Sequence, residues 1–418
     1  MSNMKKRTKH VLCLLLALML SVLCVGCDRG NANVRDDQVE TCKIGIAVYD
    51  RTGPEILMFH DYYRNYIAES FPVEFIISDA LGSPEEEAEF IHSAKEQGAA
   101  GVISFMGLDL PTVLEACAEE EIYYVMASGT VEDDVYEAVK ENPWFLGCIG
   151  PSLEEEYSAG SDMAEYFAEE GARSFLIVSS GSWNQSNVMH YTRTVGMLTA
   201  LQDYFGLTYS EDIETLAAVA ELTTIETGRE DVTITISPGW LQEESSIKTL
   251  ERAFAEGDYD ALLGAVGLTE VLDEIQAEIA TKDSGMLVGI VNCFSEENFM
   301  AVEQKDAQGS ALVNYVKGKY ASMVAPAFVA VYNAVLGDVD VVNPGGEAFR
   351  LYQEYWTARG EEEFVELYSY TQSIYKNAYS SIDLMQVIRA YNENASFEQF
   401  KALTEACDID SVRARLSE

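Results

Sequence analysis

Four runs of three consecutive glutamates are the most conspicuous candidates for chemistry in this sequence. Closely spaced carboxylates are the usual ligands of hard cations and can also act as general acids and bases. The runs are Glu85–Glu87, Glu119–Glu121, Glu154–Glu156 and Glu361–Glu363. The first and third follow Ser83 and Ser152, which suit a helix N-cap, and acids in a first helical turn complement the helix dipole. We therefore interpret these two runs as helix starts, and we expect no metal site.

The residue patterns of the common enzyme classes are absent from the sequence. None of the four histidines stands at metal-ligand spacing from another. The sequence contains no Gly-x-Ser-x-Gly elbow, no phosphate-binding loop ending in Gly-Lys-Ser/Thr and no dinucleotide fingerprint. A glycosidase cannot be argued from acid pairs, because 70 carboxylates always place some pair close together. We therefore expect no catalytic residue, no cofactor and no enzymatic activity.

The charge balance excludes a further class of function. The 418 residues include 27 Lys and Arg against 70 Asp and Glu, which gives a formal net charge of −43. Such a chain repels phosphate backbones, so we expect no nucleic acid as a partner. The content of 48% hydrophobic residues is typical of globular proteins, and the length favours two domains.

Short β-branched runs alternate with longer amphipathic segments along most of the chain. A first series extends from the strand pattern at Ile44–Tyr49 to the one at Phe145–Ile149, and a second from the helix pattern at Glu155–Glu170 to the strand pattern at Met286–Val291. Tyr209–Asp231 interrupts this alternation, and we interpret it as a loop-rich insertion. The pattern predicts an α/β protein with two doubly wound parallel-sheet domains.

The N-terminal residues have the anatomy of an export signal. Five residues at Lys5–Lys9 include four basic ones, and the apolar run Val11–Val25 that follows has about 15 residues, whereas a membrane span needs about 20. The run ends in Cys24-Val25-Gly26-Cys27, which resembles the lipobox of bacterial lipoproteins, with Cys24 at a position where an aliphatic residue is usual. This resemblance implies a signal peptide at 1–26, acylation of Cys27, and a tether at 27–42 that holds the protein to the extracytoplasmic face of the cell membrane.

Several short motifs, in this order, resemble those of the type I periplasmic binding proteins that deliver sugars to ABC transporters. Arg193–Met197 resembles the start of a helix in the second domain of that family, and Val313–Tyr320 followed by Ala321–Leu336 resembles its return crossover. The remaining motifs are Lys43–Ala47, Asp79 with Ser83-Pro84, Gln97–Ile103, and Ile149–Pro151 with Gly160.

The resemblance implies two lobes joined by crossovers and a ligand held between them. It assigns 43–150 plus about 316–338 to the N-terminal lobe, 151–315 plus about 339–358 to the C-terminal lobe, and 359–418 to a helical tail. The protein would be a monomeric solute-binding protein that captures a small polar molecule, a sugar or sugar-like metabolite, for an ABC permease. A receptor of the same fold that signals to a kinase or chemoreceptor is the alternative. The polar pairs that hold sugar hydroxyls in the family are replaced here by Ala127-Ser128, Gly267-Leu268 and Gly289–Val291.

Ligands of open α/β sheets bind beyond the carboxyl ends of the strands. The residues at or after the predicted strand ends are therefore the candidates for ligand binding. In the first domain these are Tyr49, Asp50, Arg51, Met106, Asp109 and Ser128. In the second domain they are Ser180, Trp183, Asn184, Arg193, Trp240, Thr269 and Asn292, with Asn314 at the return crossover.

The aromatic and basic candidates each have a structural alternative. The indole rings of Trp183 and Trp240 would stack on a sugar or base, or else close the edge of the domain. Arg51 and Arg193 would donate hydrogen bonds to the ligand, or else form surface ion pairs with the surplus acids.

Overall fold

The computed structural model describes residues 39–107, 109–182, 188–282, 284–305, 309, 311–372 and 377–417. Within that part of the chain, none of the helices has the length and apolar character of a membrane-crossing segment. The five cysteines in these ranges are all free. The predicted signal peptide and Cys27 lie outside the described residues.

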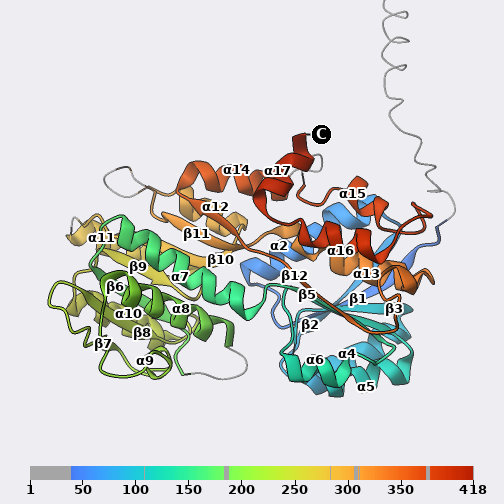
Figure 1. Ribbon diagram of the computed structural model, residues 1–418, viewed down its shortest axis with the longest axis horizontal. Helices are drawn as coiled ribbons and strands as arrows, with labels where there is room; N and C mark the ends of the chain where they lie inside the picture. Colours follow the sequence, from blue (N-terminus) through green and yellow to red (C-terminus); the bar gives the residue numbers. More distant parts are fainter. Residues whose placement is uncertain are drawn as a thin grey trace, which may run out of the picture. The chain divides into compact units, whose positions relative to one another are not determined.

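The first sheet has six parallel strands in the order β12-β5-β4-β3-β1-β2 (Figure 1). Their bounds are β1 (Cys42–Val48), β2 (Val73–Ala80), β3 (Ala99–Ser104), β4 (Tyr123–Ala127), β5 (Phe145–Gly150) and β12 (Phe349–Tyr352). The central strands are buried on both faces, which explains their nearly continuous apolar sequence.

Helices cover both faces of the first sheet. On one face lie α4 (Pro84–Glu96), α5 (Leu110–Glu120) and α6 (Asp133–Val139), whose apolar side chains form a core with Tyr124 of β4. On the other face, α13 (Ala325–Val335) packs on β3, β4 and β5. The chain between β1 and β2 forms α2 (Pro54–Tyr62), a π-helical turn at Tyr63–Ile67 and the short α3 (Ala68–Ser70).

The second sheet has seven strands in the order β13-β11-β10-β9-β6-β8-β7, of which the two edge strands β13 and β7 are antiparallel to their neighbours. Their bounds are β6 (Ser174–Ser179), β7 (Thr223–Ile225), β8 (Thr233–Pro238), β9 (Ala261–Gly264), β10 (Leu287–Cys293), β11 (Tyr315–Lys319) and β13 (Trp356–Arg359). The accompanying helices are α7 (Leu153–Glu169), α8 (Val188–Phe205), α10 (Glu244–Glu256), α11 (Leu272–Lys282) and α12 (Glu296–Glu303). The predicted α/β class with two doubly wound sheets is confirmed.

The interpretation of two acidic runs as helix starts agrees with the structure. The Ser83 hydroxyl accepts a hydrogen bond from the backbone N–H of Glu86 at 3.3 Å, and the Ser152 hydroxyl accepts one from that of Glu155 at 3.1 Å. The third glutamate of each run, however, is buried, and Glu156 lies at the candidate site described below. Helix capping therefore accounts for only part of each run.

Two predicted lobe boundaries differ from the strand pairing. We expected 316–338 in the first lobe and 339–358 in the second, but β11 pairs in the second sheet and β12 in the first. The chain passes from one sheet to the other after β5, between β11 and α13, and between β12 and β13. Strands of four residues such as β12 and β13 carry too little periodicity to show which sheet they join.

The interruption at Tyr209–Asp231 contains more regular structure than a loop-rich insertion. It includes α9 (Ile213–Ala217) and the edge strand β7, which pairs with β8. A strand of three residues is too short to give an alternating pattern in the sequence.

The described residues after β13 include four helices, which together contact both lobes. α14 (Glu361–Gln372) packs beside β13 of the second sheet, α15 (Ser381–Gln386) on α13, and α16 (Phe397–Glu405) on β12 of the first sheet. α17 (Ile409–Ser417) returns to α14, where Arg413 makes a bidentate ion pair with Glu366 at 2.9 and 3.0 Å.

Candidate functional site

A cavity of about 1130 Å³ lies at the carboxyl ends of strands from both sheets. Its wall in the first lobe comes from the start of α2 and the ends of β3 and β4. Its wall in the second lobe comes from the start of α8, the segments after β8 and β9, and the end of β10. Sites for small molecules usually measure about 300–1000 Å³. The cavity is therefore large enough to enclose a small ligand.

Seven of the residues predicted from strand ends line this cavity. They are Tyr49, Met106, Ser128, Arg193, Trp240, Thr269 and Asn292. Trp183 and Asn184, which were also predicted, lie outside the described residues. The other five predicted residues, Asp50, Arg51, Asp109, Ser180 and Asn314, are not part of the cavity wall that the structure describes.

Two of these five have local roles at the start of α2. The carboxylate of Asp50 accepts hydrogen bonds from the backbone N–H groups of Arg51 and Gly53, both at 2.6 Å, and so fixes the turn that leads into the helix. Arg51 makes an exposed ion pair with Asp79 at 2.9 Å. The structure therefore contains the surface ion pair that was the structural alternative for Arg51.

The other three point away from the cavity or lie behind its wall. Asp109 precedes α5, where its carboxylate accepts a hydrogen bond from the Thr112 hydroxyl at 2.9 Å. Ser180 follows β6 and is buried. Asn314 comes before β11 rather than after it, and its side chain accepts a hydrogen bond from the N–H of Val288 at the start of β10. It therefore lies at the amino ends of the strands, on the side of the sheet away from the cavity.

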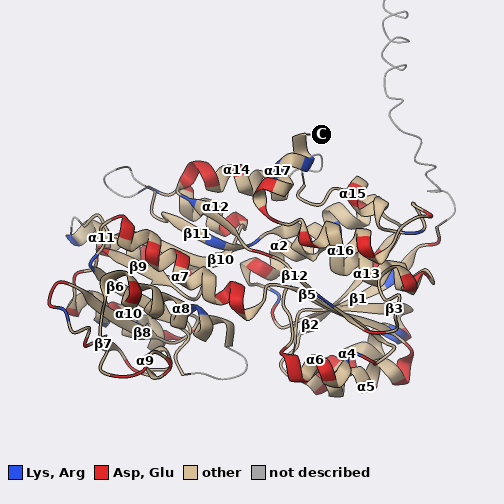
Figure 2. Cartoon of the chain, in the orientation of Figure 1, with Lys and Arg blue, Asp and Glu red and all other residues tan. Residues whose placement is uncertain are grey.

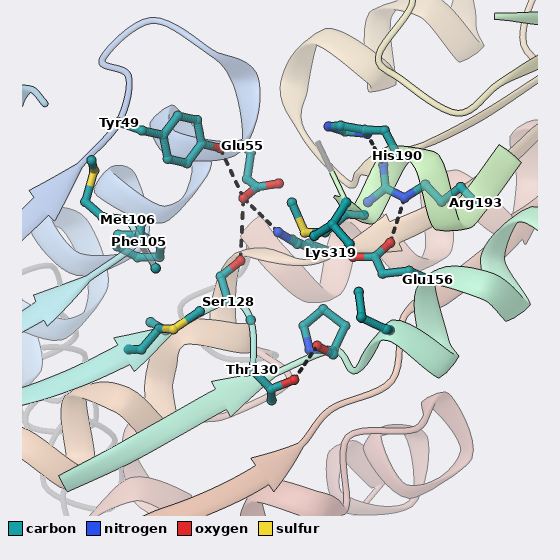
Figure 3. A pocket seen from close by; sticks show the side chains of 18 of the residues that line it. Tyr49, Glu55, Phe105, Met106, Ser128, Thr130, Glu156, His190, Arg193 and Lys319 are labelled. Carbon is teal, nitrogen blue, oxygen red and sulfur yellow. Dashed lines mark hydrogen bonds and ion pairs between the residues drawn. The ribbon is translucent and has the colours of Figure 1, made fainter. Parts of the chain in front are cut away.

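An ion pair joins the two walls of the cavity. The ammonium of Lys319, the last residue of β11, lies 3.0 Å from Oε1 of Glu55 in the first turn of α2. Tyr49 and Ser128 also donate hydrogen bonds to this oxygen, each at 3.5 Å (Figure 3). The Lys319 side chain is only 5% exposed, so the paired carboxylate offsets part of the free-energy cost of burying the ammonium group.

A second ion pair lies on the wall from the second lobe. Nε of Arg193 donates to Oε2 of Glu156 at 2.6 Å, and Tyr355 donates to the other oxygen of that carboxylate at 2.6 Å. The remaining nitrogens of Arg193 lie within hydrogen-bond distance of the Ala265 and Val291 carbonyls and the Tyr355 hydroxyl. The guanidinium of Arg193 is therefore paired in the interior of the protein. It is neither free to bind a ligand as predicted nor part of a surface ion pair.

Close helix packing brings the two partners of this pair together. A Cβ at Gly160 of α7 would collide with the backbone of Arg193, and a Cβ at Gly196 of α8 would collide with the backbone of Tyr157. The two glycines therefore let α7 and α8 approach closely. Burial raises the pKa of the Glu156 carboxyl, but the charges of Arg193 and Lys319 and the hydrogen bonds from Arg193 and Tyr355 together outweigh burial and hold that pKa below its usual value.

Aromatic and apolar side chains complete the wall. The rings of His190 and Trp240 meet edge to face, 5.0 Å between centroids, and both line the cavity. Burial and the charge of Arg193 lower the pKa of His190 to about 3, so the imidazole is neutral at pH 7. Phe105 and Met106 lie on the opposite wall (Figure 3). Such a mixture of aromatic faces and hydrogen-bonding groups suits a polar molecule with apolar C–H surfaces.

Comparison with known proteins identifies the architecture. No family model matches this chain, and no curated protein sequence matches it. Among solved structures, a galactofuranose binding protein is similar with a TM-score of 0.56 and 12% identity, covering 79% of this chain and 98% of that one. An ABC transporter solute-binding protein from Actinobacillus succinogenes 130z with bound D-allose gives 0.55 and 12%, with 78% and 99% covered. The arabinose-transporter binding protein of Shewanella sp. ANA-3 gives 0.53 and 14%, with 79% and 95% covered.

The chain has the type I periplasmic-binding-protein fold. The matched structures are covered almost completely, whereas about a fifth of this chain has no counterpart in them. The likeness agrees with the family resemblance of the motifs at Lys43–Ala47 and Arg193–Met197. At 12–14% identity it establishes the fold and not the ligand.

Sequence reasoning missed several ionisable residues that this fold brings into the cavity. Glu55, Glu156, His190 and Lys319 all line it, but none was a candidate. Lys319 had a usable signal, because lysines alternate with apolar and small residues in Val316–Lys319 and a buried strand needs a carboxylate partner for each lysine. Glu156 had been explained fully as part of a helix start, which hid its second role.

Proposed function

We propose that this protein is a lipid-anchored, extracytoplasmic solute-binding protein that captures a small polar ligand, a sugar or sugar-like molecule, and delivers it to an ABC permease. The observation that carries the proposal is the cavity at the carboxyl ends of both sheets, with Trp240 and hydrogen-bonding side chains such as Ser128 and Asn292 on its wall. The similar solved structures are described as binding galactofuranose, D-allose and arabinofuranose, which supports a carbohydrate.

The binding role needs no chemical step. Two lobes joined by short crossovers would close around the ligand, with the indole of Trp240 against one face of the sugar and the amide of Asn292 and the hydroxyls of Ser128 and Thr269 available to its hydroxyl groups. The closed form would then be recognised by the permease.

The ligand class is tested by measuring the melting temperature of the mature protein with panels of sugars, nucleosides and amino acids. A ligand at 100 times its dissociation constant stabilises the folded state by about 2.7 kcal/mol, which is easily detected. We expect at least one sugar to raise the melting temperature and to give a saturating calorimetric titration. Stabilisation by nucleosides or amino acids, with none by sugars, would show that the proposed ligand is wrong.

Membrane anchoring is tested with Cys27→Ala. Because acylation needs the thiol of the lipobox cysteine, this variant should leave the membrane fraction or keep its signal peptide. Cys42→Ala is the matched control, since Cys42 begins β1 and should not affect processing. Unchanged membrane association and mobility of Cys27→Ala would refute the anchor.

Delivery to a permease is tested by uptake of the radiolabelled sugar in cells with and without this protein. We expect uptake to fall in the deletion strain. Normal uptake together with loss of a transcriptional response to the sugar would favour the sensory receptor instead.

A further inference from the structure

The cations on the cavity wall are already neutralised. The described residues that line the cavity include three Lys and Arg residues, and each has an acidic partner. Lys319 pairs with Glu55 at 3.0 Å, Arg193 with Glu156 at 2.6 Å and Arg350 with Asp133 at 2.7 Å. The undescribed stretch before α8, residues 183–187, contains no charged residue in the sequence. An anionic ligand would therefore find no unpaired cation in the described wall.

Carboxylates remain in excess at the same cavity. Glu132, Asp134 and Glu270 also line it, all three are exposed, and none has a Lys or Arg partner among the described residues. Figure 2 shows acidic residues, in red, on helices of both lobes, in line with the net charge of −43 for the whole chain. The field around the cavity therefore attracts cations and repels anions.

One carboxylate oxygen is placed to bind a positive group. The hydrogen bonds and the ion pair of Glu55 all go to Oε1, from Lys319, Tyr49 and Ser128. Its second oxygen, Oε2, has no hydrogen-bond or ion-pair partner among the described residues, and it is not among the buried unpaired atoms. Figure 3 shows this carboxylate among the side chains that converge from both walls. Oε2 is thus an open acceptor on a carboxylate whose other oxygen already pairs with the ammonium group of Lys319.

We propose that the cavity selects its ligand by charge: it prefers a sugar-like molecule that carries an ammonium group, bound at Oε2 of Glu55, and it rejects carboxylated or phosphorylated analogues. The inference rests on the proposed function, because it specifies the chemical class within the carbohydrate ligands. An ammonium group donates a charge-assisted hydrogen bond to Oε2, whereas a hydroxyl gives only a neutral donor. A carboxylate would lose its hydration without gaining a counter-charge.

The expected differences are large enough to measure. A hydrogen bond between two charged groups should make an aminated sugar roughly tenfold tighter than its neutral parent. Like-charge repulsion and lost hydration should make the carboxylated form weaker by at least about tenfold. The preference for the amine should shrink as the salt concentration rises, because salt screens the field of the exposed acids.

The experiment is calorimetric titration of the wild-type protein at pH 7 with two matched sets of ligands. One set is glucose, glucosamine, N-acetylglucosamine and glucuronate, and the other contains the corresponding galactose derivatives. We expect the free amine to bind most tightly and the uronate most weakly, with the N-acetyl form, which has the bulk without the charge, no tighter than the parent. Uronates that bind as tightly as the neutral sugars, or amines no tighter than their parents, would overturn the inference.

The same titrations separate this inference from the function on which it rests. If neutral sugars bind but the charge series shows no order, the charge selection is wrong and the carbohydrate-binding function stands. If no sugar of either set binds, and no other sugar stabilises the protein, the proposed function is wrong and the inference falls with it.

Three single-residue variants test which carboxylates cause the preference for the amine and the rejection of the uronate. Glu55→Gln keeps the size of the side chain and should abolish the preference for the amine over its parent. Glu270→Gln, at the exposed edge of the cavity, should weaken the rejection of the uronate by a few-fold without disturbing any of the three ion pairs. Glu89→Gln, an exposed residue of α4 outside the cavity, removes the same charge and should change neither ratio. A preference for the amine that persists in a folded Glu55→Gln protein would refute the role of Glu55.

Discussion

Arg193→Ala should destabilise the protein strongly, whatever it does to ligand affinity. The side chains of Arg193 and Glu156 are only 5% and 1% exposed, and the guanidinium contacts carbonyl oxygens of the second lobe as well as the carboxylate. Removal of the arginine leaves the carboxylate of Glu156 buried without its counter-charge. Breaking a buried ion pair in this way typically costs about 3–5 kcal/mol of the free energy of unfolding.

Two further variants show whether the buried charge is the cause. Arg193→Ala combined with Glu156→Gln removes the orphaned charge, so the double variant should be more stable than Arg193→Ala alone, with a coupling energy of about 0.5–3 kcal/mol. Arg51→Ala is the matched control, because its ion pair with Asp79 is exposed and should contribute less than about 1 kcal/mol.

The assay is urea unfolding followed by circular dichroism at pH 7, with the midpoint and slope recorded for each variant. We expect Arg193→Ala to shift the midpoint far more than Arg51→Ala does. If the two variants lose similar stability, within about 1 kcal/mol of wild type, the account of Arg193 as an interior structural cation is wrong.

Three further predictions concern pH and closure. Burial raises the pKa of Glu87 to about 7 in spite of hydrogen bonds from Ser104 and Tyr124. Folding therefore takes up a proton between about pH 4.3 and pH 7, and the free energy of unfolding should fall as pH rises through that range. Glu87→Gln should flatten this slope in urea unfolding between pH 4.5 and 8, and an unchanged slope would contradict the assignment. The pKa of Glu156 is lowered in the folded state, so its effect on stability is opposite to that of Glu87. Its contribution to the free energy of unfolding should be present above about pH 4.3 and be lost in more acid solution. Glu156→Gln should remove this loss from the same pH series. X-ray scattering should show a smaller radius of gyration at saturating sugar, and an identical radius with and without sugar would argue against closure.

Local pattern was enough for the elements with strong periodicity. The strand pattern at Ile44–Tyr49 and the helix pattern at Glu155–Glu170 each lie within two residues of the observed bounds of β1 (Cys42–Val48) and α7 (Leu153–Glu169). Bulky apolar residues recur at every second position in the strand, and apolar residues recur at a period of about 3.6 in the helix. Strand pairing is decided elsewhere in the chain. β12 joins the first sheet through β5, some 200 residues earlier, and nothing within Phe349–Tyr352 specifies that partner.

The residues of the site were likewise predictable only where they depend on a single strand end, and not where they depend on contacts between distant parts of the chain. The rule that ligands lie beyond the carboxyl ends of strands led to seven residues that line the cavity, among them Trp240 and Asn292. The rule failed for Asn314, which was a candidate because it lies in the predicted return crossover at Val313–Tyr320. β11 begins at Tyr315, so Asn314 precedes the strand and lies at the amino ends of the strands. The ion pair of Glu55 with Lys319 spans 264 residues, so only the folded chain reveals it.

The central claim is that a sugar binds in the cavity between the two sheets. The most direct measurement is calorimetric titration of the best sugar into wild type, Trp240→Ala and Trp144→Ala. Trp240 lines the cavity, whereas Trp144 packs on Tyr123 in the core of the first lobe and does not line it. Loss of the indole face should weaken binding about tenfold in Trp240→Ala, and Trp144→Ala should bind like wild type when folded. Equal affinity of Trp240→Ala and wild type would contradict the account.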